Sequence, residues 1–123
     1  MTRKSSTRDN TALFVYDIVS FSRDAIRLAK GRERADLDRD LALRLALVHL
    51  IQTIGEAAGK VSDAFKDAHA NVPWSRIVGM RHRIVHEYWR VDLDVIWRVV
   101  HDDLPPLVEM LAPFARNAGQ DPS

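Results

Sequence analysis

The chain has 123 residues, which suits one domain, and its 18 Lys and Arg against 17 Asp and Glu give a formal net charge of +1. A hydrophobic content of 46% and a charged content of 28% exclude the composition of a disordered chain. The sequence contains no cysteine, which excludes disulfides, thiolate zinc sites and a cysteine nucleophile.

The first predicted helix covers about residues 10–30. Asp9 or Asn10 can cap its start, and Gly31 suits the position just after its end. Its apolar residues recur at intervals of four and three, the spacing of a helix that buries one stripe. They are Phe14, Ile18, Phe21, Ala25 and Leu28.

The second predicted helix covers about residues 41–68 and follows the charged connector RERADLDRD (32–40), which has room for a helical turn. Its apolar stripe repeats the same spacing over almost three heptads: Leu47, Ile51, Ile54, Ala58, Val61 and Phe65. Small residues lie off this stripe and would allow close packing of a further helix, including one from a second subunit: Ala46, Gly55, Ala57 and Ala64.

A short third helix is predicted from Trp74 to Tyr88 or Trp89, after the turn HANVP (69–73), because Pro73 suits the first position of a helix.

The fourth predicted helix begins after Asp92, a suitable N-cap. Pro105 and Pro106 should kink or split it, because an interior proline removes a hydrogen bond, and Asp102 or Asp103 could cap the second half. Its apolar stripe has the helical spacing again: Leu93, Trp97, Val100, Leu104, Leu107, Leu111 and Phe114.

Three long amphipathic helices with short connections predict an all-α, up-down bundle of four to five helices, with the short helix across its end. We expect one domain over residues 1–123 with a core of about residues 10–115. The first eight residues and the tail from Asn117 are expected to fray.

The distribution of charge is more informative than the net charge. Residues 1–35 hold eight Lys and Arg against four Asp and Glu, residues 73–90 hold four against one, and residues 91–123 hold two against six. Two local positive patches would attract a polyanion, although solvated helix faces account for many such charges. The polar start MTRKSSTRDN and the lack of a long uninterrupted apolar run predict a cytoplasmic protein without a membrane partner.

The segment RHRIVHEYW (81–89) concentrates groups that can act on an anion. Histidine titrates near neutrality and serves as a general acid or base, and arginine offers a forked donor that matches phosphate oxygens. Arg81 and His86 would lie about 140° apart on an uninterrupted helix. If they cooperate, either the helix ends between them or a second copy of the chain completes the site. Helix-face spacing alone favours His82 with His86.

These groups suggest a reaction that needs no metal or other cofactor. His82 and His86 have the spacing of metal ligands, but no glutamate follows the first histidine as in a zincin helix, and no carboxylate cluster accompanies them. A histidine–arginine site that faces a phosphodiester can use the 2′-hydroxyl of RNA as its nucleophile, giving a 2′,3′-cyclic phosphate and a 5′-hydroxyl. Two histidines from a symmetric dimer could supply both the base and the acid.

The spacing Arg81-x-x-x-x-His86-x-Tyr88 resembles the R-x-x-x-x-H-x-Y motif of HepT-type toxins in the HEPN superfamily. The resemblance covers roughly residues 10–115 and extends to four further segments that have the order and spacing of that family: IGEAAGKVS (54–62), VPWSRIVGMRHRIVHEYW (72–89), VDLDVIWRVV (91–100) and DLPPL (103–107).

The resemblance implies a HEPN domain, a homodimer whose motifs face one cleft, and a metal-independent endoribonuclease with Arg81 and His86 as catalytic residues and His82 in support. It also implies the toxin role in a type II or type VII toxin–antitoxin pair. The cognate antitoxin would be a minimal nucleotidyltransferase that transfers AMP to Tyr88, forms a complex with the toxin, or both. Three further arginines are candidate RNA contacts: Arg76, Arg83 and Arg90.

Two other functions remain open at this point. The first is a HEPN subunit that partners a nucleotidyltransferase and binds nucleotide or RNA without cutting it. The second is a structural helical dimer. For the single residues, the alternatives are a helix-terminal imidazole at His86, a surface cation at Arg81, and a tyrosine at position 88 that covers the end of the bundle.

Overall fold

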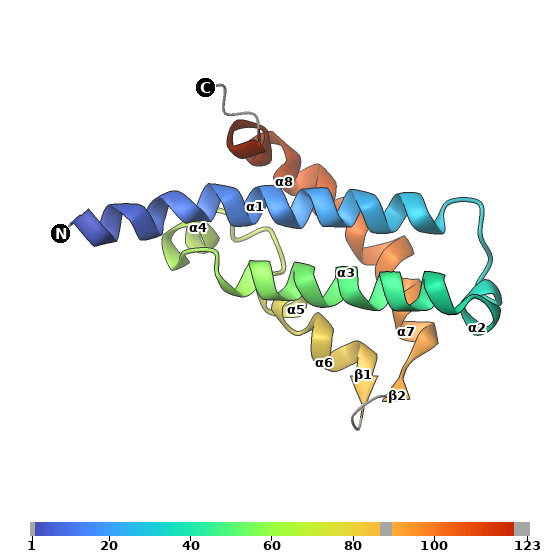
Figure 1. Ribbon diagram of the computed structural model, residues 1–123. Coiled ribbons are helices and arrows are strands. Elements are labelled where there is room, and N and C mark those ends of the chain that lie inside the picture. Colours follow the sequence, from blue (N-terminus) through green and yellow to red (C-terminus); the bar gives the residue numbers. More distant parts are fainter. Residues whose placement is uncertain (1, 87–89, 120–123) are drawn as a thin grey trace.

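A computed structural model describes residues 2–86 and 90–119, with side chains at residues 10–80, 82–84 and 92–115 (Figure 1). Three long helical segments form the bundle, and α1 packs against the other two. They are α1 (Thr2–Ala29), α3 (Leu41–Gly59) and α8 (Leu104–Gly119). The all-α prediction is confirmed. The described residues contain just one pair of strands, each two residues long: β1 (Val85–His86) and β2 (Arg90–Val91).

The first helix is longer than predicted. It begins at Thr2, so Asp9 and Asn10 lie inside it and do not cap it. Residues 2–8 belong to the helix, and their expected fraying stays a prediction. No proline or glycine interrupts residues 2–30, and a capping residue alone does not stop a helix. The predicted end is confirmed, because Gly31 has a φ of +76°, the left-handed conformation that glycine adopts without a steric penalty.

The charged connector contains the expected helical turn, α2 (Asp36–Arg39). Asp40 then caps α3 by accepting a hydrogen bond from the backbone N–H of Leu43 at 3.0 Å. The Arg32 guanidinium, with Nη2 2.7 Å from Asp40 Oδ2, and the Leu43 N–H hold the pKa of Asp40 below its ordinary value. The connector is therefore an ordered, hydrogen-bonded corner of the fold.

The second predicted helix is two helices. α3 ends at Gly59, and Ser62 caps α4 (Asp63–Ala68) by accepting from the Phe65 N–H at 3.1 Å. The N–H of Ser62 in turn donates to the hydroxyl of Thr11 on α1 at 3.1 Å. This pair of hydrogen bonds turns the chain, although the apolar spacing continues through the break.

Helix α3 supplies much of the core. Four of its apolar residues are completely buried, where α3 packs against α1 and against the short helices that follow it. They are Leu47, Ile51, Ile54 and Ala58. In the part of the chain that the structure describes, α3 is also the one helix with the length and mean hydropathy, 1.3, that a membrane span would need. Burial inside the fold covers 39% of that window, while Leu41 and Leu45 on the same helix are exposed.

The last predicted helix is present, and it runs as one continuous helical segment without a split at the prolines. Asp92 caps α7 (Leu93–Arg98) as expected, by accepting from the Val95 N–H at 3.1 Å. A π-helical turn, η1 (Val99–Asp103), then connects α7 to α8, and the N–H of Leu104 donates to the carbonyl of Val99. Asp102 and Asp103 lie inside this turn and do not cap α8, contrary to the prediction.

The two prolines fit this geometry. Pro105 and Pro106 follow the π-helical turn directly and are the second and third residues of α8. The predicted interruption therefore takes the form of a wider turn before the prolines. Helix α8 continues past Asn117 to Gly119, and the expected fraying of this tail stays a prediction.

Candidate functional site

The segment after Pro73 folds as two short helices and a hairpin, not as the predicted single helix to residue 88 or 89. The helices are α5 (Trp74–Val78) and α6 (Met80–Ile84). Gly79 separates them, and its N–H donates to the Ser75 carbonyl at 3.0 Å. A Cβ at Gly79 would lie 3.2 Å from that oxygen, so glycine relieves a close backbone approach at this corner.

The hairpin is closed at its base by backbone hydrogen bonds. Val85 lies opposite Val91 and His86 lies opposite Arg90 in the antiparallel pair. Below the pair, the N–H of Asp92 donates to the carbonyl of Ile84 at 2.8 Å. The strands extend from the ends of α6 and α7, on the side of α3 away from α1 (Figure 1).

The two motif residues lie on different elements of this segment. Arg81 is in α6, whereas His86 is in β1, because the helix ends at Ile84. Of the two arrangements that would let them cooperate, the structure has the first, in which the helix ends between them. The i,i+4 pairing of His82 with His86 on one helix face is correspondingly wrong.

Several predicted site residues fall outside what the structure describes. Tyr88 is outside the described residues, and the backbone alone is described at Arg81, His86 and Arg90. His82 is described and exposed, and its side chain makes no hydrogen bond within the described part of the chain. Its supporting role stays a prediction.

Arg76 and Arg83 are brought together by Asp103, a residue that the sequence analysis treated as a helix cap. Arg76 Nη2 lies 3.2 Å from Asp103 Oδ1 and 3.5 Å from Oδ2, and Arg83 Nη1 lies 3.2 Å from Oδ2. The Asp103 side chain is 15% exposed, compared with 55% for Arg76 and 31% for Arg83. One carboxylate from η1 thus joins α5 to α6.

A small hollow adjoins this carboxylate. It has a volume of about 100 Å³, and Arg76 and Asp103 lie in its wall together with Asp102. The rest of its wall is apolar: Pro73, Ile77, Met80, Pro106, Leu107 and Met110. Charged groups therefore stand beside an apolar surface, in the region that carries the motif helix α6.

Two further histidines each contact a backbone carbonyl oxygen four residues earlier in the chain. His69 Nδ1 lies 2.9 Å from the carbonyl oxygen of Phe65, and its ring stacks on the Phe65 ring with 4.0 Å between centroids. His101 Nδ1 lies 3.0 Å from the carbonyl oxygen of Trp97. Within residues 2–86 and 90–119, no three His, Asp or Glu side chains converge as a set of metal ligands.

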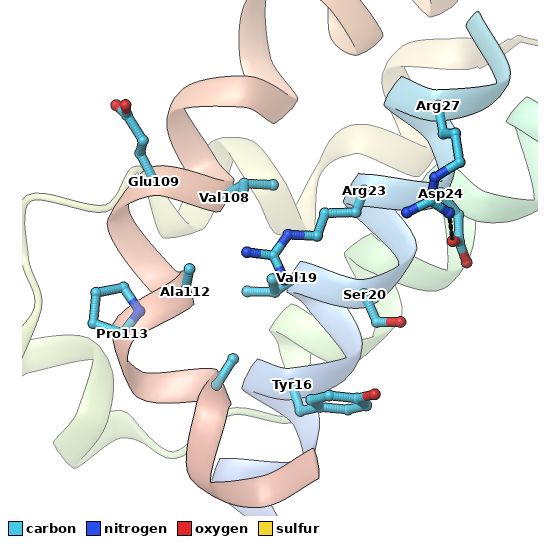
Figure 2. A pocket seen from close by; sticks show the side chains of 11 residues that line it. Tyr16, Val19, Ser20, Arg23, Asp24, Arg27, Val108, Glu109, Ala112 and Pro113 are labelled. Atoms are coloured by element: carbon cyan, nitrogen blue, oxygen red, sulfur yellow. Dashed lines mark hydrogen bonds and ion pairs between the residues drawn. The ribbon is translucent and has the colours of Figure 1, made fainter. Parts of the chain in front are cut away.

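A larger groove, about 730 Å³, lies between α1 and α8 (Figure 2). Figure 2 shows Arg23 extending from α1 toward α8, while Arg27 pairs with Asp24 on the same helix at 2.9 Å. Arg23 has no ion-pair partner among the described side chains. The groove contains none of the predicted site residues.

The residue that sequence reasoning missed is Asp103. Its type and position favoured a helix cap, because a proline pair follows closely. The available signal was its place in DLPPL (103–107), one of the segments that carry the family resemblance. Only the packing of η1 against α5 and α6 reveals what the carboxylate contacts.

Comparison with known proteins identifies the family. Residues 18–113 match the family described as HepT-like, Ribonuclease HepT-like. A protein of Methanocaldococcus jannaschii named "Putative RNase" is 31% identical over 102 residues, which are 83% of this chain and 93% of that relative. A protein of Caldanaerobacter subterraneus with the same kind of name is 35% identical over 82 residues, or 67% of this chain and 73% of the relative.

A Thermococcus cleftensis protein named "Probable ribonuclease HepT" is 34% identical over 68 residues, which are 55% of this chain and 62% of that protein. No solved structure gives a significant match. The family match covers the bundle from α1 into α8 and includes the whole segment that carries Arg81 and His86. The chain belongs to the HepT-like ribonuclease family of the HEPN superfamily.

Proposed function

We propose that the protein is a metal-independent endoribonuclease and the toxin of a type II or type VII toxin–antitoxin pair. Arg81 and His86 are its catalytic residues, and His82 supports them. The observation that carries the proposal is the end of α6 between Arg81 and His86, in a chain of the HepT-like family. Because the helix ends there, the two residues are not held 140° apart, as they would be on a continuous helix.

The reaction uses the nucleophile that RNA itself provides. One His86 imidazole accepts the proton of a 2′-hydroxyl while its oxygen attacks the adjacent phosphorus. The P–O2′ bond forms and the P–O5′ bond breaks. A second His86, protonated and supplied by the other copy in a homodimer, donates a proton to the leaving O5′. The products are a 2′,3′-cyclic phosphate and a 5′-hydroxyl.

The arginines bind the negatively charged phosphates of the RNA. Arg81 donates to the phosphate oxygens, where negative charge builds up in the transition state. Arg76, Arg83 and Arg90 contact neighbouring phosphates of the RNA. Support for this assignment comes from the grouping of Arg76 and Arg83 at Asp103, next to the helix that carries Arg81.

A minimal nucleotidyltransferase antitoxin restrains the enzyme by transferring AMP from ATP to Tyr88, by forming a complex, or by both. The attached phosphate carries a negative charge two residues from His86, where it repels the phosphates of an incoming RNA. The same bulk would block access to the site.

The test is RNA cleavage by purified protein without its antitoxin, in the presence of EDTA. His86→Ala should lower the rate on the order of 10²–10⁴-fold, the usual contribution of general acid–base catalysis. His101→Ala is the matched control, because the His101 imidazole contacts the carbonyl of its own helix at Trp97. An RNA with a single 2′-deoxy residue at the cut site should resist cleavage.

Two results would contradict the proposal. Cleavage of the 2′-deoxy substrate would show that the 2′-hydroxyl is not the nucleophile. If the wild-type protein and His86→Ala are equally harmless when produced in cells, and neither cuts RNA, the protein is a HEPN subunit that binds nucleotide or RNA without cleaving it.

A further inference from the structure

Asp103 is placed by the fold at the meeting point of three elements. It lies on η1, and it contacts Arg76 on α5 and Arg83 on α6, which are 27 and 20 residues away in the sequence. The π-helical turn adds a residue per turn relative to the usual α-helical hydrogen-bond pattern, which changes the direction of the side chains that follow. This turn therefore sets where the carboxylate points.

The carboxylate holds two guanidinium groups close together. Arg76 Nη2 and Arg83 Nη1 are both within 3.5 Å of Asp103 Oδ2, so the two nitrogens lie within twice that distance of each other. Two guanidinium cations at such a separation repel each other, and a shared carboxylate offsets this repulsion. The three groups together retain a net charge of +1.

The arginines keep most of their donors available. Arg76 uses one nitrogen on Asp103 and Arg83 also uses one, whereas a guanidinium carries five N–H donors. Within the described part of the chain, the remaining nitrogens of both side chains make no hydrogen bond. Arg76 is more than half exposed and Arg83 is about a third exposed, so these donors can reach a ligand from solvent.

We propose that Asp103 is a positioning residue that holds Arg76 and Arg83 side by side as a phosphate-binding pair for the RNA backbone. This inference rests on the proposed function, because it names how that RNA is held beside the Arg81 helix. A phosphate accepts hydrogen bonds from the free edges of both guanidiniums while Asp103 holds their other edges.

If Asp103 had a different role, its neutralisation would change the RNA affinity in the opposite direction. If the carboxylate competed with RNA for the two arginines, its neutralisation would free them and tighten RNA binding. General electrostatics also predicts tighter binding, because removing a negative charge strengthens attraction to a polyanion. Under the positioning role, Asp103→Asn weakens binding, since the amide offers one acceptor oxygen in place of two and no negative charge to hold both cations together.

Asp102 provides a matched control. It is an exposed aspartate in the same π-helical turn, and its side chain makes no hydrogen bond among the described residues. Asp102→Asn therefore removes the same charge from nearly the same place and leaves the contacts of Arg76 and Arg83 unchanged.

The experiment measures binding of a fluorescent single-stranded RNA by anisotropy, with every variant made in a His86→Ala background so that the RNA stays intact. We expect Asp103→Asn to weaken binding roughly fivefold to tenfold, the effect of about 1 kcal/mol or more in contacts to a charged group. The slope of the log of its RNA binding constant against the log of the salt concentration should be smaller in magnitude by roughly 0.7 for each phosphate that the variant no longer binds. Asp102→Asn should bind as the parent does or more tightly.

A double-variant measurement separates positioning from simple stability. Asp103→Asn should weaken binding little further when Arg76 and Arg83 are already alanine, because the residue acts through them. Asp103→Glu should restore part of the affinity. With His86 intact, Asp103→Asn should raise KM for RNA cleavage far more than it lowers kcat. A residue that merely stabilised the fold would change the unfolding midpoint and leave RNA affinity of the folded protein unchanged.

The inference is overturned if Asp103→Asn binds RNA as tightly as Asp102→Asn, even when the wild-type protein cleaves RNA. If instead RNA binding depends on Asp103 but the His86-containing protein cuts no RNA, the proposed function fails and the binding pair stands. Absence of RNA binding by the wild-type protein would overturn both.

Discussion

Arg81 lies within the helix α6, and His86, five residues later, lies on the strand β1 opposite Arg90. The N–H of Asp92 closes the base of this hairpin by donating to the carbonyl of Ile84, the last residue of α6. The helix and the strand are thus joined at a fixed corner. The two motif residues belong to elements of different geometry, and a shared site depends on how this corner is held.

The first prediction concerns the number of histidines in the site. If one His86 is the base and the other is the acid, a mixed dimer with one wild-type copy and one His86→Ala copy lacks one of the two functions. Its cleavage rate should fall on the order of 10²-fold and not by half. The mixed dimer is isolated through two different affinity tags. A rate near half that of the wild type would mean that each copy works alone, and failure to recover any mixed species would argue against a homodimer.

The second prediction concerns modification of Tyr88. Protein produced together with the proposed nucleotidyltransferase antitoxin should gain one or more AMP units in an intact-mass measurement, and it should lose RNA cleavage. Tyr88→Phe should gain none. Tyr16→Phe is the control, since Tyr16 is the other tyrosine of the chain and lines the groove between α1 and α8. A mass gain that survives in Tyr88→Phe would place the modification on another residue.

The third prediction concerns the cap that joins the hairpin to α7. Asp92→Ala leaves the N–H of Val95 without its side-chain acceptor and should lower the free energy of unfolding by about 1 kcal/mol, measured by urea denaturation. Amide exchange at Val95 should become faster. Asp92→Asn keeps an acceptor at the cap, so its free energy of unfolding should fall much less. Equal losses in the two variants would mean that the charge of Asp92, and not the cap, stabilises this junction.

The fourth prediction concerns stability against pH, where two aspartates have opposite effects. Hydrogen bonds from Arg32 and Leu43 hold the pKa of Asp40 below its ordinary value of 3.8. The stabilisation from Asp40 is therefore complete above pH 3.8 and is lost as the pH falls toward the folded-state pKa. Burial raises the pKa of Asp17, so its ionised form costs stability at neutral pH and the cost disappears in acid.

Asp40→Asn should consequently lower the free energy of unfolding at pH 7, although it keeps a capping acceptor for α3, and Asp17→Asn should raise it. Both differences from the wild type should shrink in denaturant titrations near pH 3. The same sign for both variants at pH 7 would show that charge does not determine these two effects.

Local chemistry predicted the parts of the fold that depend on neighbouring residues. The Asp92 cap and the end of α1 at Gly31 each follow from one side chain or one backbone angle, and both predictions are confirmed. The three long helices follow from the spacing of apolar residues. Where that spacing continues through a break, as it does from Ile54 to Phe65, the break was missed. The local signal was Ser62, an N-cap that follows Gly59 by three residues.

The candidate site was predicted less completely than the fold. The motif itself indicated Arg81 and His86 as candidates, but the change from helix to strand between them depends on pairing with Arg90 and Val91. Two-residue strands leave no period-two pattern to detect, although β-branched Ile84, Val85 and Val91 flank the connection. The contacts of Asp103 with Arg76 and Arg83 depend on how η1 comes together with α5 and α6 in the fold. The spacing of residues along the chain does not predict this arrangement.

The π-helical turn at Val99–Asp103 also determines how well this part of the chain tolerates a change in length. Because a π-helical turn holds about one residue more than an α-helical turn, deleting one residue there would leave a regular α-helix whose later residues face nearly the same way. Leu104, Leu107 and Leu111 would still face the core that they now fill, whereas a deletion within α8 would rotate the residues after it by about 100°. The π-helical turn can therefore absorb the loss of one residue without turning α8 away from the bundle.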